Sequence, residues 1–387
     1  MNGLVNWIWG FLILTACSQK AEQSQETFLE DGADREIVIS TELSEPIQFN
    51  DFADLQFIQL ETSDSVLLSR PSKILKVGSN LIILDKRLNA VLRFDEQGQF
   101  LNRIGQNGDG PGEYRRPMDI LWDDRSRRLK VLVNSHSGYF AYDLKGNYYS
   151  KQTNSFFTIG FAQCGEQMAW FNGYNSDTHN LYLTDGIGEV VDRYFPYDPS
   201  NYRFGIDFSG GISNIQNGGF LYAETADPVI YEFDSDMNLS HKYRFDLGPL
   251  TWPGDRKTEL DAFWEKVETF ETAYLGSQFY SNNWGLVFDY YDKNHGYAFY
   301  SYNDGELYAR SSLANDPLAE ILWAPCGFGP NQFISFLNPA GFDDKTNDFQ
   351  QRIHSDYPIL YDLLTDRSRD YYDNPIVVVL TFNQDTI

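Results

Sequence analysis

The chain has 387 residues, of which 42% are hydrophobic and 16% aromatic, and this is enough apolar side chain for a large buried core. Its 30 Lys and Arg against 55 Asp and Glu give a formal net charge of -25, so it would repel a phosphate backbone and a nucleic-acid partner is excluded. A chain of this length forms either two average domains or one large all-β domain.

The N-terminal apolar stretch, residues 4–16, has the length of a secretory signal and is too short to span a bilayer as a helix. It ends in Leu14-Thr15-Ala16-Cys17, which resembles a bacterial lipobox, where the cysteine is lipidated after cleavage. We therefore expect residues 1–16 to be a lipoprotein signal peptide, Cys17 to carry the lipid and residues 17–35 to be a polar tether. No Lys or Arg precedes the stretch. Two alternatives therefore stay open, namely a start further upstream and an ordinary signal peptide with an incidental cysteine.

A repeat with a period near 45 residues follows the tether. In each copy an aspartate after an aromatic or polar residue opens a turn that ends at Gly or Asn and leads into a strand. These aspartates are 48, 42 and 49 residues apart, at Asp95, Asp143, Asp185 and Asp234. The runs between the turns are short and rich in Val, Ile, Tyr and Phe, so the period predicts one four-stranded propeller blade per copy.

The repeat predicts six blades over residues 36–387. Blade one has strands near 74–77, 81–84, 90–94 and 100–104, and blades two to four cover 118–149, 156–195 and 211–245. Blade five has strands near 286–290, 297–302 and 306–310, and blade six has strands at 321–324, 333–337 and 376–382. The strand missing from blade six is at the N-terminal end, at 37–40 or 55–60, and its pairing would close the ring and remove exposed sheet edges. Two small helical insertions are expected, at 258–275 and 357–364.

Four segments of the first third carry a family resemblance, namely Phe57–Thr62, Leu81–Asp85, Phe94–Leu101 and Ile104–Tyr114. They resemble the six-bladed β-propeller lipoproteins common in Bacteroidetes, a family similar to NHL-repeat propellers. The lipobox fits this family, and so does Asp373-Asn374-Pro375 before the last strand. The resemblance implies a six-bladed propeller and an envelope location, and it carries over no catalytic residue.

In a propeller, the loops between blades and the loops from each second to each third strand lie on one face, the usual binding face. We expect that face to present six residues as ligand-binding candidates, namely Asp85, Arg87, Asp109, Glu113, Tyr114 and Arg115. Their mixture of charged and aromatic groups suits a polar ligand such as a sugar or a peptide. An ion pair between Arg115 and Asp85 is the structural alternative. The glycine-rich residues 105–112 lack the Gly-Lys-Ser/Thr ending of a phosphate loop, so we expect them to shape the connection between two blades.

Three of the five histidines, His136, His179 and His295, fall in second-to-third-strand loops of blades two, three and five. Neutral imidazoles that converge on one mouth would bind Zn²⁺, which could activate water. The alternative, which we favour, is that they are solvated residues of polar loops, because no short metal-ligand spacing such as HExxH occurs. We therefore expect no cofactor. Cys164 and Cys326 are expected to be small buried residues.

The sequence thus predicts an all-β, six-bladed propeller whose last blade is closed by an N-terminal strand. The favoured function is a non-enzymatic binding or scaffolding module on the cell envelope, for a polar ligand or a protein or carbohydrate partner. The alternatives are a metal-dependent hydrolase or lyase with a cation near the propeller axis, and a purely structural assembly subunit. The lipid would attach the chain to the membrane, and Ser18 after Cys17 favours the outer membrane by analogy with other lipoproteins.

Overall fold

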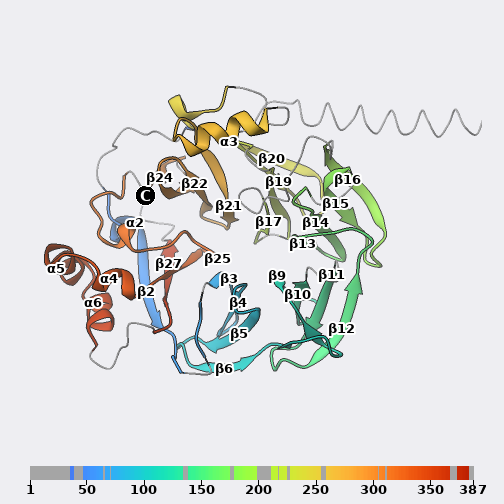
Figure 1. Cartoon of the computed structure of the whole chain (residues 1–387), viewed down its shortest axis with the longest axis horizontal. Coiled ribbons are helices and arrows are strands. Elements are labelled where there is room, and N and C mark those ends of the chain that lie inside the picture. The colour runs from blue at the N-terminus through green and yellow to red at the C-terminus, as the bar shows by residue number, and fades with distance from the viewer. Residues whose placement is uncertain are drawn as a thin grey trace, which may run out of the picture.

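The computed structural model describes residues 35–38, 47–63, 66–69, 71–133, 138–174, 178–197, 211–216, 218–224, 227–253, 259–303, 305–309, 312–366 and 373–382. Six sheets of four or five strands stand around a central axis, as Figure 1 shows along that axis. The predicted all-β, six-bladed propeller is confirmed. The signal peptide, Cys17 and nearly all of the predicted tether lie outside the described residues. None of the described helices is long and apolar enough to cross a membrane.

Each blade is an antiparallel sheet that runs from an inner to an outer strand. Blades one to three comprise β3–β6 (Pro71–Val77, Asn80–Asp85, Ala90–Asp95, Phe100–Arg103), β9–β12 (Pro117–Asp123, Arg128–Val133, Gly138–Tyr142, Tyr148–Thr153) and β13–β16 (Gly160–Cys164, Gln167–Phe171, His179–Thr184, Val190–Pro196). Blades four and five comprise β17–β20 (Gly211–Asn214, Phe220–Ala223, Val229–Phe233, Leu239–Asp246) and β21–β24 (Tyr274–Ser281, Gly285–Tyr291, His295–Ser301, Leu307–Ala309). The core lies largely between neighbouring blades, where buried residues such as Ile82 of blade one and Val131 of blade two share one cluster.

The repeated aspartates form the same turn in each of the first four blades. Asp95 Oδ1 accepts hydrogen bonds from the backbone N–H of Gln97 (3.0 Å) and of Gln99 (2.8 Å), and so replaces backbone partners that the tight turn lacks. Equivalent pairs of bonds, all 2.9–3.0 Å, are made by Asp143, Asp185 and Asp234. These aspartates therefore fix the hairpin from the third to the fourth strand in each of these four blades.

An N-terminal strand closes the ring at blade six. β2 (Ala53–Gln59) pairs antiparallel with β27 (Ile376–Phe382), followed inward by β26 (Gln332–Leu337) and β25 (Gly327–Gly329). The predicted closing segment 55–60 is thus confirmed. The other candidate, 37–40, does not close the ring, because β1 (Arg35–Val38) pairs parallel with β20 and adds a fifth strand to blade four.

The inner strand of blade six is not the predicted 321–324. In that stretch Leu322 makes only a single bridge to Leu337, next to the short 3-10 helix η3 (Leu318–Glu320). The inner strand is β25, and its Gly327 lies against the inner strand of blade one. A Cβ at Gly327 would be 2.3 Å from the carbonyl oxygen of Ile74, so only glycine allows this approach.

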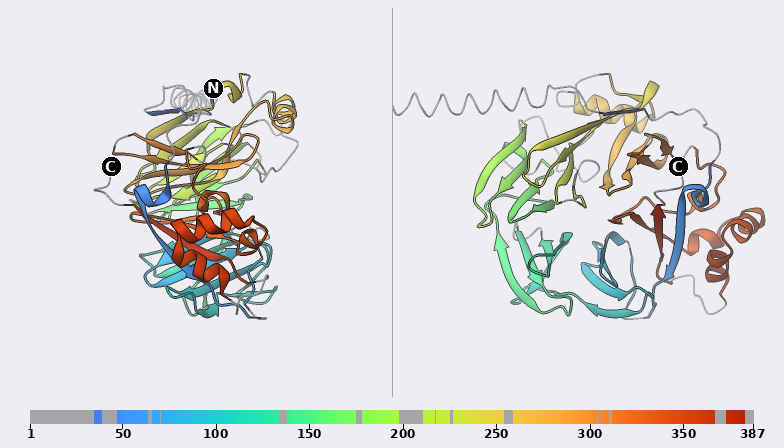
Figure 2. Two further views of the ribbon diagram at one scale, coloured as in Figure 1. Left: turned by 90° about the vertical axis from the view of Figure 1, so that its left-hand side faces the viewer. Right: turned by 180° about the vertical axis from the view of Figure 1, so that it is seen from behind.

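The insertions are helical, with one difference from the prediction. Helix α3 (Leu260–Glu268) is shorter than the expected 258–275, because Phe270 has a positive φ of 58° and β21 begins at Tyr274. The ring of Tyr274 stacks on Tyr291 of the next strand, 4.9 Å away. The helix expected at 357–364 is α6 (Pro358–Thr365), which with α4 (Ala340–Asp343) and α5 (Asn347–Asp356) lies on the outer side of blade six (Figures 1 and 2). Two short elements, α2 (Phe49–Phe52) and η2 (Gly248–Leu250), complete the described helices.

Candidate functional site

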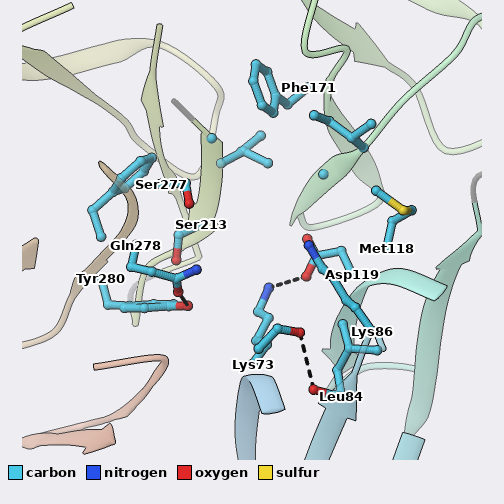
Figure 3. Close-up of a pocket in the computed structure, with 16 residues that line it drawn as sticks. Lys73, Leu84, Lys86, Met118, Asp119, Phe171, Ser213, Ser277, Gln278 and Tyr280 are labelled. Carbon is cyan, nitrogen blue, oxygen red and sulfur yellow. Dashed lines mark hydrogen bonds and ion pairs between the residues drawn. The ribbon is translucent and has the colours of Figure 1, made fainter. Parts of the chain in front are cut away.

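A polar pocket of about 180 Å³ lies on the propeller axis, where the inner strands of five blades converge. Its polar side chains include Lys73 from β3, Asp119 from β9, Ser213 from β17, and Ser277 and Gln278 from β21 (Figure 3). The pocket lies near the first residues of β3, β9, β13 and β17, so it opens toward the loops between blades. This is the face on which the sequence predicts ligand binding.

An ion pair between Lys73 and Asp119 crosses from blade one to blade two inside this pocket. The Lys73 Nζ lies 2.7 Å from Asp119 Oδ1, and the two side chains are only 15% and 9% exposed. Asp119 also accepts hydrogen bonds from the backbone N–H of Ile120 (2.8 Å) and of Phe161 in blade three (3.4 Å). Both charges are therefore largely removed from water, and each depends on its protein partners.

Blade five supplies the opposite wall. The Tyr280 hydroxyl donates to Gln278 Oε1 (2.8 Å), which fixes the orientation of the carboxamide (Figure 3). The Gln278 backbone N–H donates to Asp289 Oδ1 (2.8 Å), so a buried carboxylate holds this strand in place. Burial raises the pKa of Tyr280 well above its usual range, so this hydroxyl stays protonated and remains a donor.

A second cavity of about 380 Å³ lies at the other end of the axis. It shares Lys73 and Ser213 with the first cavity and is bordered by the ends of the inner strands, where Lys76, Asp123 and Asn214 lie. The two cavities thus share Lys73 and Ser213 as a common border. Lys73 is therefore within reach of a ligand in either cavity.

The predicted surface residues divide into structural and exposed groups. The buried Asp85 carboxylate accepts the N–H groups of Ser69 (2.6 Å) and Leu88 (2.9 Å), which fixes the turn after β4. The buried Tyr114 hydroxyl accepts from the Val91 N–H (3.2 Å) and donates to the Ile104 carbonyl (2.7 Å), and burial raises its pKa above its usual range. Neither side chain is available to a ligand.

The remaining candidates of that group shape or flank the glycine-rich loop. Glu113 accepts the Gly110 N–H (2.9 Å), and Arg87 is exposed. Arg115 pairs with Asp109 (2.6 Å), not with Asp85 as the structural alternative required. Both oxygens of the Asp85 carboxylate instead accept backbone N–H groups.

Two of the three histidines begin third strands, His179 in blade three and His295 in blade five. His179 Nδ1 lies 2.8 Å from Thr178 Oγ1, and His295 Nε2 lies 2.9 Å from the buried Asp289 Oδ2. His136 lies outside the described residues. The described part of the chain contains no group of three or more His, Cys, Asp or Glu side chains close enough to hold one metal ion. A metal site that includes His136 therefore stays a prediction.

The axial residues were missed in the sequence, although a signal for two of them exists. The inner strands of blades one and two read Pro71-Ser72-Lys73-Ile74-Leu75 and Pro117-Met118-Asp119-Ile120-Leu121. A charged residue at one fixed position of an otherwise apolar inner strand is unusual, because charges are rarely buried unless they are paired. The opposite signs at that position point to a pair on the axis.

The chain was compared with known proteins. A family model described as a domain of unknown function (DUF4934) matches residues 35–381. A candidate exported protein from Bacteroides fragilis has a solved structure with a TM-score of 0.73 at 17% identity, and the match covers 90% of this chain and 99% of that one. A DUF4221 family member from Bacteroides vulgatus matches with a TM-score of 0.52 at 11% identity, over 86% and 98% of the two chains. No curated protein matches. At these identities the structural matches show the shared fold alone.

Proposed function

The chain belongs to the DUF4934 family, and we propose that it is an exported, lipid-anchored binding module that holds a small polar ligand in its axial pocket. One observation carries this proposal. Five blades line a pocket of about 180 Å³ on the loop-bearing face and four of them direct polar side chains into it, with the paired Lys73 and Asp119 in its wall. Scaffolding of a protein partner by the same face is the broader form of this function.

The size and chemistry of the pocket restrict the ligand. Pockets for drug-sized ligands measure roughly 300–1,000 Å³, so this one suits a ligand no larger than a monosaccharide or an amino acid. Charges of both signs, hydroxyl groups and a carboxamide are present, at Lys73, Asp119, Ser213, Ser277 and Gln278. A ligand with both donors and acceptors would pair with all of these groups.

Ligand binding is tested by titrating the protein with a defined panel of free amino acids, neutral monosaccharides and dipeptides, read by nondenaturing mass spectrometry. At least one class should bind, and Lys73→Met should weaken that binding about tenfold because it removes a charged partner. Lys345→Met is the matched control. Lys345 also pairs with a carboxylate, Glu320 at 3.1 Å, but neither residue lines the axial pocket. Binding that both variants weaken equally would contradict the axial site.

Two observations support the lipid anchor: the lipobox at Leu14–Cys17, and the structural likeness to a Bacteroides fragilis protein that is described as exported. We place the lipid on Cys17 and the chain at the outer membrane, with NHL-like blades exposed beyond a polar tether. Metabolic labelling with an alkyne fatty acid, followed by membrane fractionation, tests this. The label should be lost in Cys17→Ser, and a label retained in that variant would contradict the assignment.

A further inference from the structure

A third pocket, separate from the two on the axis, lies at the corner between blades one and two. It measures about 330 Å³ and is lined by Asn89, Asn107, Gly108, Arg115 and Arg116. None of these five residues carries an apolar side chain. From this pocket we infer a binding site for the carboxylate of an acidic sugar, with Arg115 and Arg116 on the acid group and Asn89 and Asn107 on neighbouring hydroxyl groups.

The charge of the site is opposite to that of the protein as a whole. The chain carries a net charge of -25, yet this pocket presents two guanidinium groups. Arg115 pairs with Asp109 at 2.6 Å, but the two side chains are 60% and 71% exposed, so water screens the pair. A ligand carboxylate therefore replaces Asp109 as the partner of Arg115 at little cost in free energy. Arg116 has no ion pair with any residue that the structure describes. An anion is therefore the ligand that these groups favour.

The loop that presents the arginines is held in shape by its own contacts. A short parallel pair joins β7 (Gln106–Asn107) to β8 (Glu113–Tyr114), and the Gly108 N–H donates to the Tyr114 carbonyl (3.1 Å). The Glu113 carboxylate fills the inside of the loop, where a Cβ at Gly108 would lie 1.9 Å from its Oε2. A preformed loop loses little conformational entropy on binding, and this lowers the cost of recognition.

The backbone around the pocket is also constrained. Asn89 and Arg116 both have a positive φ, of 51° and 50°. Asparagine tolerates this conformation, whereas arginine adopts it only where its surroundings impose it. Strained residues of this kind cluster at ligand sites. At Arg116 the conformation places the side chain in the wall of the pocket, directly before β9 begins at Pro117.

The carboxamides of Asn89 and Asn107 favour a sugar acid over a simple inorganic anion. Each carboxamide has both donor and acceptor atoms, and this matches the vicinal hydroxyl groups of a sugar, which also donate and accept. Inorganic phosphate would accept from the guanidinium and carboxamide N–H groups but would offer few donors to the carboxamide oxygens of Asn89 and Asn107. A peptide would present apolar side chains that the pocket gives nothing to pack against.

Isothermal titration calorimetry of the full chain with galacturonate, galactose and inorganic phosphate tests the inference, since the two sugars differ only at C6, which is a carboxylate in galacturonate and a hydroxymethyl group in galactose. Galacturonate should bind at least about tenfold more tightly than galactose and than phosphate. Arg115→Gln and Arg116→Asn should each weaken galacturonate binding about tenfold, and asparagine at 116 keeps the positive φ.

Arg125→Gln is the matched control, because Arg125 forms an equally exposed pair with Glu166 (2.9 Å) at the opposite end of its blade. Galacturonate binding should stay unchanged in this variant. The inference would be overturned by equal binding of galactose and galacturonate, by phosphate binding as tightly as galacturonate, by no binding at all, or by equal losses in the arginine variants and the control. Loss of the axial site in Lys73→Met should leave galacturonate binding intact, so the two proposals fail independently.

Discussion

Lys73 and Asp119 stand at the same position of neighbouring inner strands and are joined by a 2.7 Å ion pair across the boundary between two blades. In a propeller, equivalent residues of successive blades face the axis at one level, so opposite charges at such a position meet. The pair therefore links blade one to blade two inside the channel. It also places two charges where a ligand would find them already oriented.

Lys73→Met should lower the free energy of unfolding by about 2–3 kcal/mol, because it leaves the Asp119 carboxylate buried without its countercharge. The double variant Lys73→Met, Asp119→Asn should recover most of this loss, to within about 1 kcal/mol of the wild type. A double-mutant cycle in urea measures the coupling between the two residues. Strictly additive losses would mean that the pair contributes nothing to the fold.

Asn374 joins the two ends of the propeller chain. Its buried side chain accepts the Leu68 N–H (2.6 Å) and donates to the carbonyls of Glu61 and Val66 (both 2.7 Å), while its backbone N–H donates to Thr62 (2.9 Å). Asn374→Ala should lower the free energy of unfolding by about 3 kcal/mol, since it leaves buried backbone groups unpaired.

Asn374→Asp should destabilise almost as much as the alanine variant, because a carboxylate cannot donate to the two carbonyls. Asn50→Ala serves as the control, since Asn50 is exposed and makes one 3.3 Å bond to Asp356. Urea unfolding of the three variants provides the comparison. If Asn50→Ala lowered the free energy of unfolding as much as Asn374→Ala, the hydrogen bonds of Asn374 would have no special role in stability.

The blades could be predicted from the sequence because their signal is local. Each turn aspartate, such as Asp95, bonds to N–H groups two and four residues later, so its chemistry is contained within five residues. The inner strand of blade six was mislocated because β25 is three residues long and depends on contact between Gly327 and Ile74, which are distant in sequence. The start of blade five was missed because apolar spacing near Tyr274 continues that of α3.

The ligand-binding candidates named from the sequence stay predictions, and two of them have structural roles in the fold. Asp85 and Tyr114 are polar residues of loop-bearing segments, yet both are buried and bonded to the backbone, and only tertiary packing decides this. The axial Lys73 and Asp119 lie inside strands that read as core. Their convergence requires the blades to be assembled, which no local pattern encodes.

Because β2 closes the ring, we expect the loss of β2 to impair folding far more than the loss of β1. A chain that lacks residues 1–46 loses, among the elements that the structure describes, β1 alone, the extra strand of blade four, and should fold to the same ring. A chain that lacks residues 1–60 also loses β2 and leaves the apolar β27 as an open edge, so it should aggregate. Size-exclusion chromatography and thermal unfolding separate the outcomes. Equal thermal midpoints for the two truncations would contradict closure by β2.

The repeated turns predict a dependence of stability on pH. Although burial alone would raise it, hydrogen bonds from Asn147 and Lys145 hold the pKa of the Asp143 carboxyl below its usual value. A carboxylate with a lowered folded-state pKa stabilises the fold above its unfolded pKa, and this contribution is lost as the pH falls through the folded pKa. Stability should therefore decrease below about pH 4.

In Asp143→Asn this decrease should be shallower, because position 143 no longer titrates. Glu189→Gln removes an exposed carboxylate from the corresponding turn of blade three and should leave the slope closer to that of the wild type. Urea unfolding at a series of pH values between about 2 and 6 measures the slope. An unchanged slope in Asp143→Asn would exclude this carboxylate as a source of the acid sensitivity.

Cys164 and Cys326 should be chemically inert in the folded protein. Both are buried and neither forms a disulfide. Burial raises the pKa of the Cys164 thiol to about 12 and raises that of Cys326 as well, so at pH 8 roughly one Cys164 in ten thousand is the reactive thiolate. In the Cys17→Ser chain, an aromatic disulfide reagent should label neither thiol until denaturant is added, and should then label both. Rapid labelling of either thiol under native conditions would mean that the interface around it opens, because reaction requires both access and deprotonation.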